Sequence, residues 1–99
     1  MTPEISARLD SFDIRVMAEA KFYFLFVRDV CLAMVPREGE GFAAIGSTGL
    51  MTDDGLLYLV WRDDKPYLTY KEFETAATPE QLEKVQRFSA DLKAALGVE

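Results

Sequence analysis

The residues of this chain that could carry out chemistry are mainly carboxylates and hydroxyls, because the sequence has no histidine and a single cysteine, Cys31. Histidine is the commonest general base and metal ligand, and one thiol can form neither an internal disulfide nor a cysteine-rich zinc site. Cys31 lies inside an apolar run with no base beside it, which is typical of a buried residue rather than a nucleophile. We therefore expect no catalytic residue and no cofactor, and an enzyme using carboxylates and hydroxyls is the least favoured function.

Two acidic pairs suggest a metal site at first sight. Asp53-Asp54 and Asp63-Asp64 flank the same expected strand, and its extended residues span about 20 Å. Carboxylates that far apart cannot share one ion, whereas aspartate is common in turns. We interpret both pairs as solvated turn residues and expect no metal site.

A glycine-rich stretch offers a second kind of site. Residues 39–55 hold five of the six glycines, and Gly46, Ser47, Thr48 and Gly49 stand together within it. Backbone amides of such loops can gather around a phosphate, but phosphate loops normally lead into a helix and supply a lysine, and neither follows here. Glycines of a turn or bulge are the favoured interpretation, with these four residues as the candidate mouth of a ligand pocket.

The net charge is −6, and residues 38–80 carry the whole excess of acids. Such a field repels phosphate backbones, so we expect no binding to nucleic acid or to anionic membranes. The longest apolar runs are far shorter than the ~20 residues of a membrane span, and the first residues lack the pattern of a signal peptide. These observations predict a cytoplasmic protein, in agreement with a single reduced cysteine.

The elements that must position these residues begin with a clear helix over residues 79–96. Thr78, Pro79 and Gln81 provide a cap, a first helical position and a capping box, and Gly97 ends the helix. Apolar residues three or four apart make this helix amphipathic. A shorter helix, capped by Thr2, is expected over residues 3–10.

The middle of the chain is expected to form strands. The expected strands cover residues 22–27, 30–35, 42–47, 56–62 and 67–71, with a brief one near residues 12–16. A helix over residues 13–27 remains open as an alternative to the first hairpin. Residues 1–99 are thus expected to form one α+β domain, an antiparallel sheet of four to six strands with the long C-terminal helix packed on one face.

Several of these strands are apolar on both sides, as in sheets that are covered on both faces. One long helix covers one face only, so we expect a second copy of the chain on the other, with a different protein, a ligand, or closure by residues 1–20 as alternatives. The leading function is therefore protein contact, as a homodimer, adaptor or regulatory module. The alternative is a ligand-binding domain with an apolar pocket between sheet and helix.

Aromatic residues with a polar end are the best interface candidates, since interfaces are enriched in them. The candidates are Trp61, Tyr67, Tyr70 and Tyr23. We expect Trp61 and Tyr70 to share one face of the last hairpin.

Overall fold

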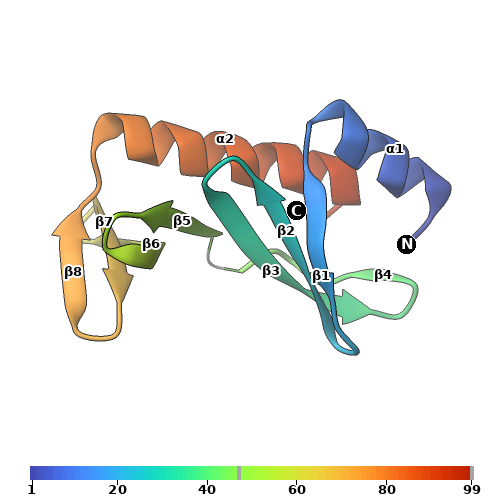
Figure 1. The fold of residues 1–99 in the computed structure, drawn as a ribbon, viewed down its shortest axis with the longest axis horizontal. Coiled ribbons are helices and arrows are strands. Elements are labelled where there is room, and N and C mark those ends of the chain that lie inside the picture. Colours follow the sequence, from blue (N-terminus) through green and yellow to red (C-terminus); the bar gives the residue numbers. More distant parts are fainter. Residues whose placement is uncertain (47, 99) are drawn as a thin grey trace.

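The computed structural model describes residues 1–46 and 48–98. Within those residues an eight-stranded antiparallel sheet lies under two helices (Figure 1). The helices are α1 (Pro3–Ser11) and α2 (Pro79–Leu96). The strands are β1 (Arg15–Glu19), β2 (Tyr23–Arg28), β3 (Cys31–Glu38), β4 (Gly41–Phe42), β5 (Thr48–Thr52), β6 (Gly55–Arg62), β7 (Lys65–Tyr70) and β8 (Phe73–Ala76). The α+β class is confirmed, but the sheet has more strands than the expected four to six.

The strands pair in the order β1-β2-β3-β5-β6-β7-β8, and β4 pairs with the far end of β3. The first expected hairpin is confirmed, with Arg28 opposite Cys31 and a turn at Asp29, whose φ is 55°. The alternative helix over residues 13–27 is wrong. Phe24 and Phe26 are buried on one side of β2, and this alternating burial outweighs the helix propensity of residues 17–21.

The expected strand over residues 42–47 is also wrong. Only Gly41–Phe42 form a short strand there, and the place beside β3 is taken by Thr48–Thr52, where the sequence predicts a loop. Leu50 explains the difference, because its side chain is 3 % exposed and reaches the core from β5. The neighbouring Ser47 lies outside the described residues.

The last hairpin is confirmed, with one strand added, but the four-residue turn that the sequence predicts over residues 63–66 is wrong, because Lys65 and Pro66 already pair in β7. Asp63 and Asp64 both have positive φ, 51° and 65°, and form the two-residue turn between β6 and β7. The sequence did not predict strand β8, because no alternation of apolar and polar residues marks it. In the structure all four of its residues are exposed. It pairs with β7 from Tyr67 opposite Ala76 to Tyr70 opposite Phe73.

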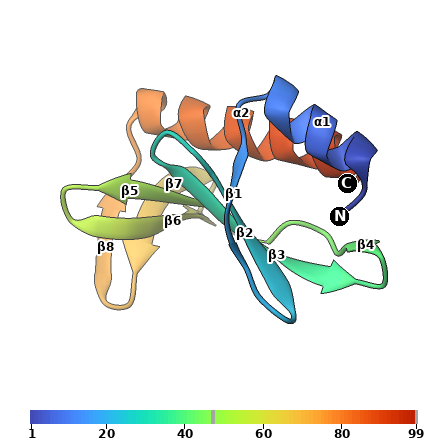
Figure 2. The same cartoon turned by 45° about the vertical axis from the view of Figure 1, so that its right-hand side comes forward.

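Both expected helices are confirmed, with their caps. The backbone amide of Ile5 donates to Thr2 Oγ1, Thr78 forms the full capping box with Gln81, and Gly97 adopts a left-handed conformation with φ of 72°. Figures 1 and 2 show that both helices lie on the same side of the sheet, where α2 packs against α1, β3 and β5. No helix found in residues 1–46 and 48–98 has both the length and the apolar character that a membrane crossing requires.

The core lies between the helices and the sheet. Its largest fully buried side chains come from β2, β3, β6, β7 and α2, and from the link between α1 and β1: Phe24, Phe26, Val35, Leu57, Leu68, Val85, Phe88, Leu92 and Ile14. The expected apolar stripe of the long helix therefore does face the sheet. Residues 1–20 do not cover the opposite side of the sheet, because α1 lies beside α2 and β1 extends the sheet at its edge.

Candidate functional site

The side chains that point away from the helices form a largely apolar surface, which we name the open face. Its members alternate along their strands with the buried core residues and are half-buried or exposed: Leu25, Val27, Leu32, Met34, Leu56, Tyr58, Val60 and Tyr67. The register joins them into rows, with Val27 opposite Leu32 and Leu25 opposite Met34. Neither helix covers this face.

Near the middle of the sheet, β3 and β5 pair only from Cys31 opposite Leu50 to Ala33 opposite Thr48. Beyond that point the two strands separate, and hollows lie on both sides of the sheet. Gly46 lines the hollow on each side. The segment that leads into β5 therefore borders two different surfaces.

The hollow on the open face has a volume of about 600 Å³ and is lined by aromatic and apolar side chains with two cations, Arg62 and Lys71. The rings of Tyr58 and Tyr70 lie 6.4 Å apart between centroids, and Lys71 Nζ lies 5.3 Å from the centre of the Tyr70 ring. Arg62 Nε donates to Glu74 Oε1 at 2.6 Å. A partner that binds this face would therefore contact aromatic rings and cations whose positions are already set by contacts within the chain.

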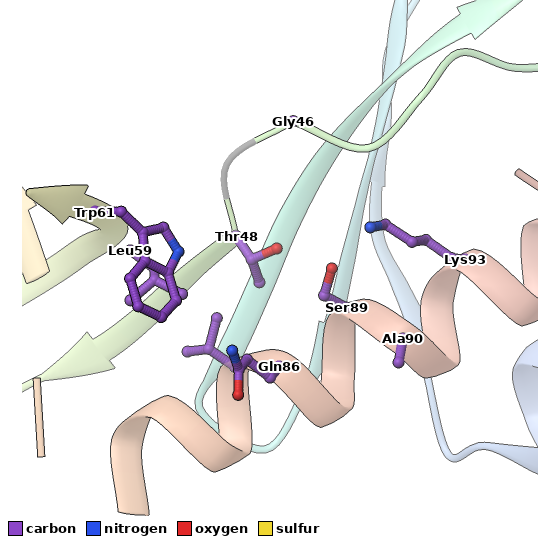
Figure 3. A pocket seen from close by; sticks show the side chains of 9 residues that line it. Gly46, Thr48, Leu59, Trp61, Gln86, Ser89, Ala90 and Lys93 are labelled. Atoms are coloured by element: carbon purple, nitrogen blue, oxygen red, sulfur yellow. The ribbon is translucent and has the colours of Figure 1, made fainter. Parts of the chain in front are cut away.

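The second hollow, which we name the helix-side cleft, has a volume of about 420 Å³ and lies between α2 and the β5–β6 part of the sheet. Figure 3 shows its lining: Trp61 and Leu59 at one end, and the polar ends of Thr48, Ser89 and Lys93 turned toward the space below Gly46. Thr48 is 6 % exposed and Trp61 is 52 % exposed. The cleft thus joins an aromatic wall to a group of hydrogen-bond donors.

The four interface candidates do not lie together. Tyr23 and Tyr67 alternate with buried neighbours and point to the open-face side as half-buried residues, and Tyr70 lines the open-face hollow. Trp61 instead lines the helix-side cleft. The register, with Leu59 opposite Leu68 and Trp61 opposite Pro66, gives Trp61 and Tyr70 the same side of the hairpin by alternation, as expected. The two side chains nevertheless line different hollows, because the ring of Tyr70, at the end of β7, lies beside the ring of Tyr58.

The four candidates for the mouth of a pocket are also divided. Gly46 and Thr48 line the helix-side cleft, and Ser47 lies outside the described residues. Gly49 faces the opposite way, since a Cβ atom placed on it would lie 2.9 Å from Cδ1 of Leu56 on the open face. The glycine pattern did not point to Ser89 or Lys93, which come from α2, or to Met34, which lines the open-face hollow.

Cys31 and the acidic pairs have the structural surroundings expected of them. Cys31 is 4 % exposed, its Sγ lies 3.6 Å from the carbonyl oxygen of Lys84, and burial raises the pKa of its thiol. Asp53-Asp54 and Asp63-Asp64 form turns at opposite ends of β6. In the part of the chain that the structure describes, no group of three or more His, Cys, Asp or Glu side chains is placed to hold a metal ion.

Compared with protein-family models, curated proteins and solved structures, this chain matches none of them. The open face and the helix-side cleft are the two surfaces from which a function can be argued.

Proposed function

We propose that this chain acts through protein contact and that its first partner is a second copy of itself, joined through the open face. The observation that carries the proposal is the row of apolar side chains, from Val27 and Leu32 to Tyr58, on the side of the sheet opposite both helices. Apolar surface removed from water contributes about 25 cal/mol per Å². Covering a few hundred Å² of this face would therefore contribute several kcal/mol, comparable to the whole stability of a small domain.

The size of the face suits a dimer. The molecule measures 38 Å by 25 Å along its longest axis and one of its shorter axes. A face of those dimensions can supply the roughly 800 Å² per partner that a standard interface buries. A two-fold axis brings the same surface of both copies together, and this is the commonest symmetry of soluble assemblies.

The charge distribution also permits self-association. Each copy carries a net charge of −6, so an interface rich in acids would be repulsive. The side chains that define the open face are uncharged, and Arg62, Glu74 and Lys71 lie at its margin. Apolar centres surrounded by charged margins are typical of protein interfaces.

We further propose that this contact takes place in the cytoplasm and does not involve nucleic acid or a membrane. The lone Cys31 stays reduced in that compartment, and the acidic residues between positions 38 and 80 disfavour polyanions. No catalytic step is part of this function.

The experiment compares two methionine-to-lysine variants by light scattering on a sizing column at about 100 µM, where an interface of standard size is normally occupied. Met34 lies on the open face and is 51 % exposed, whereas Met17 lies at the bulge of the edge strand β1 and is 63 % exposed. Both substitutions replace an exposed side chain, so both proteins should fold. We expect a dimer for the unmodified chain and for Met17→Lys, and a monomer of 11.2 kDa for Met34→Lys.

A monomeric unmodified chain at that concentration contradicts the proposal. A dimer that Met34→Lys leaves intact assigns the contact to another surface and contradicts it as well. Circular dichroism of both variants separates lost association from lost folding.

A further inference from the structure

Lys93 lies in surroundings that are unusual for a lysine. Its side chain is half-buried in the helix-side cleft, although lysines are mostly exposed. The ion pairs found within residues 1–46 and 48–98 involve other side chains. Figure 3 shows the hydroxyl groups of Ser89 and Thr48 around the same space, so three hydrogen-bond donors converge there.

The opposite end of the cleft is apolar. The indole of Trp61 is 52 % exposed although the side chain of Leu59 packs against the core. Tryptophan is enriched at binding surfaces, because it presents a large apolar surface with one polar group. Trp61 thus offers a flat wall to whatever enters the cleft from solvent.

The lining residues also determine which charge fits. None of the nine described residues that line the cleft is acidic, in a chain with 17 acidic residues. An ammonium group flanked by two hydroxyls favours an anion with oxygen acceptors. The cleft volume, about 420 Å³, falls within the range of small-molecule sites, about 300–1,000 Å³.

We infer that the helix-side cleft binds a small carboxylic acid with an aromatic or apolar body, its carboxylate on Lys93, Ser89 and Thr48 and its body against Trp61. This site lies on the opposite side of the sheet from the proposed dimer contact. The two proposals can therefore fail or succeed separately. The oligomeric state of each sample tests the dimer proposal, and ligand titration tests the cleft.

Trp61 itself can report binding, because it is the only tryptophan in the chain. Its fluorescence is followed during titration with 3-phenylpropanoate, and in parallel with 3-phenylpropanamide, which has the same shape without the charge. We expect a saturable change with the acid, with a dissociation constant between about 0.1 and 5 mM for a ligand of this size. The amide should bind about tenfold more weakly, since it forms no charge-assisted hydrogen bond with the ammonium group.

Two lysine-to-methionine variants locate the site. Lys93→Met keeps the length of the side chain and removes the charge, so we expect it to weaken binding of the acid by about tenfold and to leave binding of the amide unchanged. Lys84→Met is the matched control on the same helix, where Lys84 contacts Asp29 outside the cleft. It should bind the acid as the unmodified chain does.

Equal affinity for acid and amide overturns the inference, as does the absence of a saturable change up to about 20 mM, well above the expected range. A loss of binding in Lys84→Met as large as in Lys93→Met would point to general electrostatics rather than to this cleft. If Lys93→Met fails to fold, the comparison of acid with amide on the unmodified protein still decides the result.

Discussion

The ring of Tyr58 lies across the backbone of Gly49, so that a Cβ atom placed on Gly49 would be 3.3 Å from Cε1 of Tyr58. The same atom would be 2.9 Å from Cδ1 of Leu56. Gly49 stands opposite Tyr58 in the register, in the row that continues through Leu32 to Val27. A glycine at this position lets the side chains of Tyr58 and Leu56 approach the backbone of β5 closely on the open face.

We therefore predict that Gly49→Val lowers the free energy of unfolding by about 1–3 kcal/mol, because a branched side chain would displace Tyr58 and Leu56. Urea denaturation followed by circular dichroism measures this loss. Gly46→Val is the control, since an added Cβ atom at Gly46 meets nothing within 4 Å, and a change within about 0.5 kcal/mol is expected there. Equal losses in both variants would contradict the role given to the close approach.

Arg28 connects β2 to α2 through a partly buried ion pair. Its Nη1 atom donates to Asp91 Oδ2 at 2.8 Å and to the carbonyl oxygen of Phe12 at 3.0 Å, and both charged side chains are less than one-third exposed. Asp91→Ala leaves the guanidinium group half-buried without its counter-charge, so we predict a loss of stability of about 1–3 kcal/mol.

The control for that prediction lies on the same helix. Glu83 and Arg87 form an ion pair in which both side chains are 70 % exposed, and exposed pairs of this spacing contribute about 0.3–0.5 kcal/mol. Glu83→Ala should therefore change the urea midpoint little. A loss as large as that of Asp91→Ala would show that burial does not distinguish the two pairs.

The buried thiol of Cys31 predicts a pH dependence. Burial is the largest cause of its raised pKa, and the nearby charge of Arg28 acts in the opposite direction. A raised pKa in the folded state means that the unfolded chain loses this proton first. The contribution of the Cys31 thiol to the free energy of unfolding is therefore complete below the ordinary thiol pKa of about 8.5. It is lost as the pH rises through the pKa that the thiol has in the folded state.

Urea titrations at neutral and alkaline pH check this expectation. Cys31→Ala should show a smaller fall in stability between the two pH values than the unmodified chain. An equal fall in both proteins would assign the alkaline loss to other groups. Reaction of Cys31 with a disulfide reagent at neutral pH should also be slow until denaturant is added.

The turn between β6 and β7 can be stabilised. Asp64 has a φ of 65°, a conformation that favours glycine, so we predict that Asp64→Gly raises the free energy of unfolding by about 0.5 kcal/mol. Asp54 has the corresponding place in the turn between β5 and β6, but its own φ is not positive. Asp54→Gly should lower stability by a similar amount, and thermal melts of the two variants should shift in opposite directions.

Where the signal is local, the sequence was enough to predict the fold. Helix 79–96 is marked at both ends by Thr78 and Gly97 and by its own period, and the hairpin turns at Asp29 and Asp63-Asp64 follow from adjacent residues. These features depend on contacts between residues that are close in the chain. The prediction of one helix-covered face followed from the same patterns.

Tertiary structure decided the remainder, because it depends on which distant strands pair. Residues 42–47 and 48–52 are comparable in apolar character, and only the competition for the edge of β3 places Leu50 in the core and leaves the earlier segment mostly unpaired. Strand β8 forms through pairing with β7 alone. For the candidate site, the alternation of β6 shows that Tyr58 and Trp61 point to opposite sides. Since both sides of that strand are apolar, only the packing of α2 determines that Trp61 lines a cleft and that Tyr58 is left on the open face.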